Sequence, residues 1–557
     1  MQPFDQPLDE IDPRVATLLP PRQFADDLLR WYWVYVHSIF PFLHWPMFKA
    51  RYYSLWKQKA PPGNQEEAFE DLLFLSTVNM VLALACLRNE LMIPIELRQH
   101  YGEEFYRRSL RLISAETLDT ASLSVVQLLL LRALYLYFGG RADRCWLVSG
   151  AALRVAIGLG LHVAAKRRAL NQIEGEMRLR VWHGGCVPLD QVLATTFGRP
   201  GMIYPGLSQT PLPLAIGEEY LSATDEGRQP EGIPSRMDFI IFGTKIFEVL
   251  EEMRAVQRAP LLKITQSGNE FSIPEPSSVL RVNSRIEELL ESRPLHLRHD
   301  TDLSTMGLDE DTMKCFQHQC GAIRFRILTL RVFLLRPSLL AEAHRWTTST
   351  AGAKPTPSSM LHERLHLEIC SLCLDTVHTM LEDIHRTMAT SAAILSSWYS
   401  LHFTAASAAV LIVATLSPKL GVSLDTEPLK SSWDRAMAIF EFHKAHVASA
   451  GRAMEVLIRF RESITLRARA RLGMLPSTPH QQCLPPQQYQ QGTQQPYRQP
   501  PAQTWDPSQA IPSPLSMGAG GTAGLMEGLD EFLTSDSLNE AWLSTQDWGQ
   551  GNWMLHY

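Results

Sequence analysis

The sequence predicts an all-α protein. Long apolar segments repeat large hydrophobic side chains every three to four residues, which places those side chains on one helix face. We find neither the alternation of apolar and polar residues typical of strands nor a short internal repeat. With 557 residues, 45% of them hydrophobic, the chain is long enough for a large core and for more than one packing unit.

The first helix follows residues 1–23, a Pro- and acid-containing stretch that we expect to be flexible. It should start near Asp26 or Asp27, because acidic residues favour a helix N-terminus, and end at Pro41. The remaining predicted helical segments are 66–90, 94–115, 122–139, 145–160, 175–198, 235–259, 311–336, 363–388, 393–416 and 431–472. A Pro-rich connector at 204–235 leaves open a division of the helical body, residues 24–471, into two lobes near 205–235.

The stretch RCWLVSGAALRVAIGLGLH, residues 144–162, raises the question of a nucleotide-binding loop. Such a loop needs G-x-G-x-x-G between a strand and the helix that follows it. Here the third glycine is missing, and Gly158 and Gly160 come after the apolar helical pattern. Glycine is favoured at helix C-termini because it readily adopts positive φ. We therefore predict a packed helix that ends at these glycines, and no cofactor.

The C-terminal part differs from the body in composition and charge. Residues 472–523 are rich in Gln, Pro and Gly and are predicted to form a disordered linker. Residues 524–557 interleave acids with Leu, Phe and Trp, which is typical of an activation segment that binds a coactivator. A C-terminal helix docked on the chain's own body is the alternative. The residues expected to contact a coactivator are Leu529, Phe532, Leu533, Trp542, Leu543, Trp548 and Trp553.

The charge distribution argues against wide, sequence-independent DNA contact by the body. The chain has 52 basic and 58 acidic residues, and the segment after Arg471 holds seven of the acids but only one base, Arg498. The body is therefore neutral, whereas extensive phosphate contact needs a surplus of Lys and Arg. We expect this chain alone not to bind DNA.

The cysteines and the apolar runs indicate an intracellular protein. Eight cysteines are scattered without a disulfide pattern, which fits a reducing compartment, and the N-terminus shows no secretory signal. The most apolar runs, 72–87 and 403–416, are shorter than a membrane span and contain polar side chains. We interpret both as buried helices and expect no membrane association.

Two short patterns could in principle bind a metal. HERLH, residues 362–366, fits the H-E-x-x-H pattern of zinc proteases and continues to Cys370 and Cys373. This stripe spans about 12 Å of helix, too far to close around one ion. KCFQHQC, residues 314–320, has the wrong spacing for a zinc finger. We expect no metal site and no enzyme, and a HExxH metalloenzyme remains only a remote alternative.

Basic residues near the end of the body have two interpretations. Arg459, Arg461, Arg467, Arg469 and Arg471 could form a nuclear-import signal or a solvated helix end, where cations interact favourably with the dipole. The shorter run Lys166–Arg168 is a weaker signal of the same kind.

Four segments in order resemble the fungal-specific transcription factor domain, the helical middle region of zinc-cluster regulators. They are 28–48 (LLRWYWVYVHSIFPFLHWPMF), 144–163, 175–203 and 333–340 (FLLRPSLL). The resemblance covers about 25–470, and its specific part lies in the first half. It implies an all-helical regulatory domain in a nuclear protein. The motif residues, which we interpret as scaffold, are Trp146, Arg154, Glu176, Arg180, Trp182, Asp190, Arg199 and Pro200.

Departures from the family pattern limit the expected polar network. Leu179 and His183 stand where the family usually has Arg and a second Trp, and Val163 replaces a common Arg or His. We expect Arg154, Glu176, Arg180 and Asp190 to form a thinner network of paired, buried charges. Family members also begin with six zinc-binding cysteines, whereas the first cysteine here is Cys86. The chain would then act through a DNA-bound partner, or it is a fragment that lacks its start.

The sequence thus favours a nuclear transcription regulator that activates genes by recruiting a coactivator or acting through a DNA-bound transcription factor. A homodimer stays open, although no clear heptad supports it. The alternative is a ligand-sensing or partner-sequestering module without its own activation function.

Overall fold

The computed structural model describes a helical body between residues 19 and 471. The described ranges are 19–57, 63–89, 93–114, 121–164, 170–197, 199–203, 207–264, 274–348, 357–388, 397–445, 447 and 449–471. Within them the regular structure is helical and no strand is present, which confirms the predicted all-α class. The linker 472–523 and the segment 524–557 lie outside the described residues.

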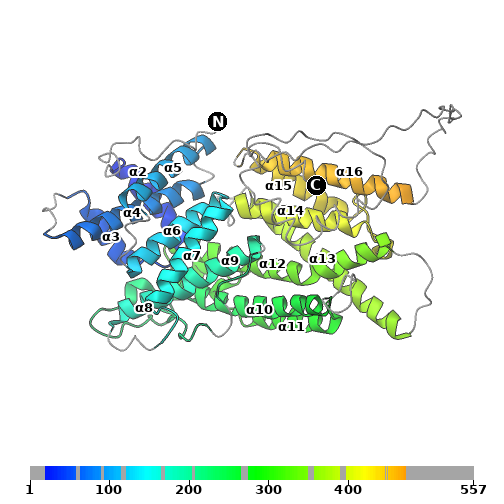
Figure 1. Cartoon of the computed structure of the whole chain (residues 1–557), viewed down its shortest axis with the longest axis horizontal. Coiled ribbons are helices and arrows are strands. Elements are labelled where there is room, and N and C mark those ends of the chain that lie inside the picture. The colour runs from blue at the N-terminus through cyan, green and yellow to red at the C-terminus, as the bar shows by residue number, and fades with distance from the viewer. Residues whose placement is uncertain are drawn as a thin grey trace, which may run out of the picture.

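The N-terminal half, drawn in blue and cyan in Figure 1, contains the helices up to α9. Its elements are α2 (Arg22–Tyr32), the π-helical turn η2 (Trp33–His37), α3 (Trp45–Ser54), α4 (Gln65–Arg88), α5 (Ile95–Leu112), α6 (Leu123–Phe138), α7 (Ala142–Gly158), α8 (Gln172–Val181), the π-helical turn η5 (Trp182–Cys186) and α9 (Val187–Phe197). The first helix begins at Arg22, so the predicted start near Asp26 and the flexible limit at residue 23 are wrong by a few residues.

The C-terminal half, green to orange in Figure 1, packs beside the first. Its elements are α10 (Asp238–Ile264), α11 (Pro276–Glu291), α12 (Glu310–Thr348), α13 (Pro357–Thr387), α14 (Ser397–Ala414), α15 (Leu429–His443) and α16 (Ala450–Arg471), with the 3₁₀ turns η6 (Glu218–Tyr220), η7 (Leu295–Leu297), η8 (Leu303–Met306) and η9 (Pro418–Leu420) in the connections. The long helix α12 joins the halves: it packs against η2 as well as α13 and α14. One contiguous hydrophobic core runs from Ala25 to Ile464.

Local sequence explains where several helices stop. Helix α7 ends in a Schellman motif, in which the amide of Leu161 donates to Ala156 O and that of Gly160 to Ile157 O. Gly160 has φ 70°, a value that disfavours other residues. The predicted packed helix is confirmed. Between α8 and α9, a Cβ on Gly185 would lie 2.6 Å from Leu130 Cδ1, so glycine lets η5 approach α6 without a shift of the Leu130 side chain.

Helix α4 is mostly inside the body. Among the described helices it is the one long and apolar enough to cross a membrane, but 72% of its most apolar window is buried in the protein. Ser76 Oγ lies 2.8 Å from Ser109 Oγ, and Arg132 of α6 donates to the carbonyls of Ser109 and Ile113. These polar contacts tie α4, α5 and α6 together as core helices.

Candidate functional site

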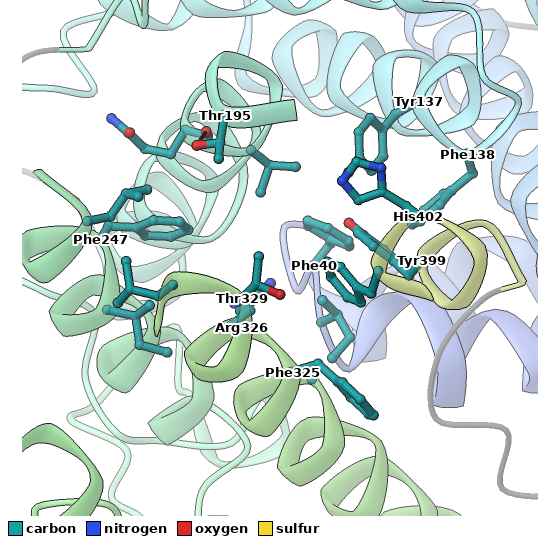
Figure 2. Close-up of a pocket in the computed structure, with 18 of the residues that line it drawn as sticks. Phe40, Tyr137, Phe138, Thr195, Phe247, Phe325, Arg326, Thr329, Tyr399 and His402 are labelled. Carbon is teal, nitrogen blue, oxygen red and sulfur yellow. Dashed lines mark hydrogen bonds between the residues drawn. The ribbon is translucent and has the colours of Figure 1, made fainter. Parts of the chain in front are cut away.

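A partly enclosed aromatic cavity lies where the two halves of the body meet. Its volume is about 150 Å³. The N-terminal half contributes residues of η2 and the turn after it, of α6 and α9, and Arg88 at the end of α4, and the C-terminal half contributes α10, α12 and α14 (Figure 2). Ligand sites are common at such junctions, because two packed units leave a cleft that neither fills alone.

Helix α12 supplies one wall of the cavity through a single face. Ala322, Arg326, Thr329 and Phe333 line it at spacings of three and four residues. In Figure 2, Phe247 lies on one side of the cavity, Phe40 and Tyr399 lie on the other, and Thr329 and Arg326 lie between them. The walls are therefore rich in aromatic rings, and polar side chains reach the cavity from α12 and also from other elements, such as Thr195 of α9 and His402 of α14.

The ionisable groups of the cavity respond to burial. Burial, followed by the charge of Arg336, lowers the pKa of His402 to about 4, so this imidazole is neutral at pH 7. Burial also raises the pKa of the Tyr399 hydroxyl, which stays protonated. Burial lowers the pKa of Arg326, partly offset by Tyr399 and Tyr137. Because the ordinary pKa of arginine is above 12, Arg326 remains the cation of this wall.

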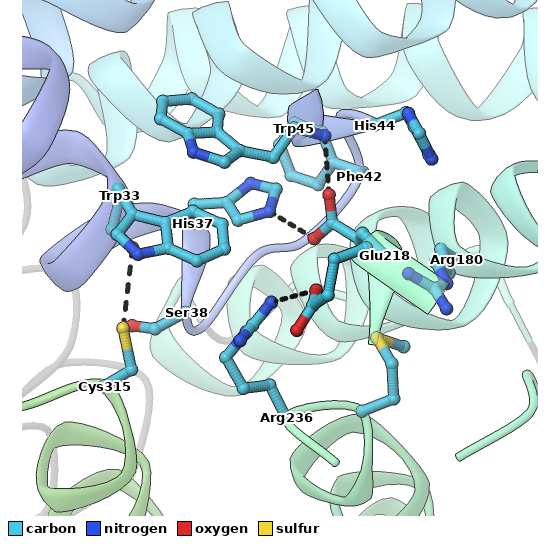
Figure 3. A network of polar contacts seen from close by, with 12 residues as sticks. Trp33, His37, Ser38, Phe42, His44, Trp45, Arg180, Glu218, Arg236 and Cys315 are labelled. Carbon is cyan, nitrogen blue, oxygen red and sulfur yellow. Dashed lines mark hydrogen bonds and ion pairs between the residues drawn. The ribbon is translucent and has the colours of Figure 1, made fainter. Parts of the chain in front are cut away.

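A second feature, a buried ion cluster, lies close to η2 (Figure 3). Glu218 is 4% exposed. Its Oε1 lies 2.6 Å from His37 Nε2, and its Oε2 accepts a 2.5 Å hydrogen bond from the amide of Trp45. Arg236 donates to the neighbouring Glu219 over 2.7 Å and stacks on the ring of Trp33 at 4.7 Å.

The charge of Glu218 is well compensated. Burial alone would raise its pKa, but the attraction and hydrogen bond of His37, together with the charges of Arg180 and Arg236, hold the pKa at about 2. The carboxylate therefore stays ionised and joins η6 to η2 and α3. Each acceptor oxygen has a donor, which indicates a structural ion cluster and not a site open to substrate.

The Pro-rich connector is docked on the body through this cluster and through α8. Glu176 accepts the amide of Leu214 at 3.0 Å, and Arg180 donates to Ile216 O at 2.7 Å. Glu176 and Arg180 are themselves 3.9 Å apart. These two motif residues hold an extended chain segment in place, a role that the sequence did not indicate.

The expected four-residue polar network does not form. Arg154 is exposed on α7, and Asp190 is instead bonded to the backbone amides of Met202 and Ile203 at 3.0 and 2.9 Å. That expectation is wrong for both residues, because α7 turns Arg154 to solvent and the loop after α9 supplies donors for Asp190. Glu176 and Arg180 alone come together.

The other motif residues support the same region. Trp182 is fully buried and donates to Ser208 Oγ at 2.9 Å. Arg199 pairs with Asp143 and stacks on the half-buried ring of Trp146 at 5.4 Å. Pro200 is exposed next to Arg199.

The HERLH stripe does not gather ligands. His362 is exposed and lies 3.4 Å from Glu275, whereas His366 is buried 3.8 Å from Glu342. Glu363 pairs with Lys419, and burial raises the pKa of Cys370 and Cys373 to about 12. Across the part of the chain that the structure describes, no three His, Cys, Asp or Glu residues could hold a metal together.

The remaining predicted sites can be followed only in part. The seven residues expected to contact a coactivator, from Leu529 to Trp553, and the run Lys166–Arg168 lie outside the described residues. Of the basic cluster, Arg461 pairs with Asp425 at 2.8 Å and stacks on Trp433 at 5.1 Å. Sequence reasoning missed Glu218, His37 and the cavity. For the cavity, the signal available in the sequence was Arg326, an arginine at a core-facing position of an apolar helix.

Comparison with known proteins identifies the first half of the body. Residues 29–291 match the family model described as the fungal specific transcription factor domain. These residues form a fungal specific transcription factor domain. The match covers α2 through α11 and includes the buried ion cluster and the N-terminal walls of the cavity. The domain's description and the relatives' names are those of transcription factors.

Curated relatives extend the similarity beyond this domain. The sorbicillinoid biosynthetic cluster transcription factor 2 of Penicillium rubens is 24% identical over 442 residues, 77% of this chain and 59% of the relative. The sorbicillinoid biosynthetic cluster transcription factor sor3 of Hypocrea jecorina is 22% identical over 78% of this chain and 59% of the relative. Transcription factor FBD3 of Gibberella moniliformis is 23% identical over 72% of this chain and 51% of the relative. The chain thus spans between half and six tenths of these relatives.

Proposed function

We propose that the protein is a nuclear transcription regulator that activates genes by recruiting other proteins. In this proposal the helical body is the regulatory scaffold, and residues 524–557 deliver the output to a coactivator. The observation that carries the proposal is the fungal specific transcription factor domain within a charge-balanced body, followed by an acidic and aromatic C-terminal segment. Such segments bind helix-accepting grooves through aromatic anchors, while acidic residues steer the encounter.

DNA contact is assigned to a DNA-bound partner. The body has as many acidic as basic residues, and the described arginines near its C-terminal end include Arg461, which is held by Asp425. Two of the relatives are named as transcription factors of the sorbicillinoid biosynthetic cluster. We accordingly propose that this protein regulates a gene cluster of the same general kind.

The test is a reporter assay with residues 524–557 fused to an unrelated DNA-binding domain. The fusion is expected to activate, and the double variant Trp542→Ala with Phe532→Ala should lose most of the activation. The pair Thr534→Ala with Gln546→Ala leaves every aromatic and acidic side chain in place and is the matched control. Absent activation, or activation that survives the aromatic double variant, would remove the role of this segment.

A ligand-sensing module is the second candidate function, and the aromatic cavity between the halves favours it. If the protein only sequesters a partner, co-expression should lower the occupancy of a zinc-cluster partner on its DNA in a gel shift. If it activates, the partner's occupancy should stay unchanged while transcription rises.

A further inference from the structure

Arg326 is a cation enclosed by protein that has no acidic partner. No carboxylate, carbonyl or hydroxyl of the described residues hydrogen-bonds its guanidinium. Its contacts are the ring of Phe239, 4.8 Å from the guanidinium carbon, and the backbone of α10 at Gly243, where an added Cβ would lie 3.5 Å from Nη1. A buried cation without such partners is costly, so an external anion is the natural counterpart.

The accessible part of Arg326 faces the aromatic cavity. The side chain keeps intermediate exposure although protein surrounds it, because it borders this space (Figure 2). One turn along the same face, Thr329 has a buried hydroxyl without a hydrogen-bond partner among the described residues. The guanidinium thus borders a ligand-sized volume, the unpartnered hydroxyl lies beside it on the same helix face, and both can donate to an oxygen.

The size and walls of the cavity define the rest of the ligand. A volume of about 150 Å³ is close to that of a cavity which holds a single benzene ring. The opposing rings of Phe247 and Phe40 offer faces and edges for stacking. Polar side chains of other elements, among them Arg88, Thr195 and His402, also line the cavity. Arg326 is the lining cation without a hydrogen-bond partner among the described residues, so the charged end of a ligand should lie against α12.

We infer that this cavity binds a small monocyclic aromatic carboxylate, with its carboxylate on Arg326 and Thr329 and its ring between Phe247 and Phe40. A neutral apolar molecule would leave the guanidinium uncompensated. A phosphate would place a larger charge against mostly aromatic walls, and a peptide helix exceeds the volume. Because residues of both halves line the cavity, such a ligand would contact both and oppose their separation.

The proposal is tested by titration calorimetry of the full chain with benzoate as the probe. Benzamide, which has the same shape without the charge, should bind at least tenfold more weakly, because charge-assisted hydrogen bonds are about twice as strong as neutral ones. Cyclohexanecarboxylate, which keeps the charge but not the aromatic ring, should bind more weakly than benzoate. Equal binding of benzoate and benzamide would overturn the assignment.

Three variants and a control locate the site. Arg326→Met should weaken benzoate binding at least tenfold, and Arg326→Lys should restore part of it, since lysine keeps the charge but not the bidentate geometry. Thr329→Val, which has the same shape, should weaken binding severalfold without disturbing the fold. Arg331→Met removes a cation of the same helix that pairs with Glu287 at 2.6 Å and should leave binding unchanged.

The outcomes separate this inference from the proposed transcriptional role. Binding is measured on purified protein and does not depend on residues 524–557, so a reporter that stays silent leaves it standing. Benzoate binding that is unaffected by Arg326→Met would overturn the inference. Displacement of benzoate by a synthetic peptide of residues 524–557 would also overturn it, because the cavity would then belong to that segment.

Discussion

Two buried arginines, Arg132 of α6 and Arg326 of α12, differ in how the fold accommodates their charge. Arg132 is 3% exposed and donates to the carbonyls of Ser109 and Ile113 at 2.6 and 2.8 Å. Those carbonyls end α5, where the helix dipole favours a cation. Arg326 has aromatic and backbone contacts but no such acceptors among the residues that the structure describes. The first arginine stabilises the fold, and the second is available to a ligand.

The largest effect is expected for Arg132→Met. It would remove the side-chain donor of the Ile113 carbonyl and break the buried network with Ser76 and Ser109, whose carbonyl would keep only its bonds from Ser76 Oγ and the Ile113 amide. This predicts a loss of about 4 kcal/mol in the free energy of unfolding. Urea unfolding followed by circular dichroism measures it. The control Arg107→Met removes a partly exposed i,i+4 pair with Glu103 and should cost less than about 1 kcal/mol. Equal effects of the two variants would contradict the structural role of Arg132.

The next effect concerns the buried ion cluster. Glu218→Gln keeps the shape of the side chain but removes the charge that compensates His37 and Arg180, which predicts a loss of about 3 kcal/mol in urea unfolding. Glu219→Gln is the matched control, because that side chain is 41% exposed in its pair with Arg236 and should change stability by less than about 1 kcal/mol. Similar losses of stability in the two variants would show that the buried cluster contributes no more to stability than an exposed ion pair.

The pH dependence of the same pair should be smaller but specific. The pKa of Glu218 falls from an ordinary 4.5 to about 2 in the fold, so its contribution is complete above about pH 4.5 and declines as the pH falls toward 2. The stability gap between the native protein and Glu218→Gln should therefore narrow between pH 5 and pH 3. A gap that stays constant over this range, measured by thermal unfolding, would place the pKa of Glu218 near its ordinary value.

The smallest effect is expected in the HERLH segment. Glu363→Gln breaks an exposed pair with Lys419, so it should change the free energy of unfolding by less than about 0.5 kcal/mol. Addition of EDTA should leave the unfolding midpoint unchanged. Stoichiometric zinc in the purified protein, or a midpoint that falls on chelation, would favour the metal site that the sequence pattern suggested.

The sequence predicts the helices best where the apolar periodicity agrees with the residues that start and stop helices. The segments predicted at 66–90 and 122–139 match α4 and α6 within one or two residues, because polar caps such as Asn64 and Ser122 precede apolar runs. Helix α3 was not predicted, and neither was α11, although Val279, Val282, Ile286 and Leu289 repeat at helical spacing. The predicted helix at 431–472 is two helices, α15 and α16; no proline lies between them, and the nearby Gly451 falls inside the first turn of α16. Helix α12 continues through Pro337, whereas the sequence predicted that this helix would end at residue 336, just before the proline.

The sites were harder to predict than the helices, because their residues meet across long separations. His37 and Glu218 are 181 residues apart, and no local pattern joins them. The motif residues Glu176 and Arg180 were recognised, but the backbone that they hold, at Leu214 and Ile216, has no sequence signal of its own. The aromatic cavity combines elements from η2 to α14, so no local sequence pattern indicated it, although Arg326 lies among apolar residues on the inner face of α12.

The most direct test of the contrast between the two arginines is urea unfolding of Arg326→Met with and without benzoate. Without benzoate the variant should be at least as stable as the native protein, because a buried cation without acceptors is removed. With benzoate only the native protein should gain stability, since ligand stabilises the state that binds it. A loss of more than about 2 kcal/mol in Arg326→Met without ligand, the size expected for a broken buried network, would show that Arg326 serves the fold and contradict the account.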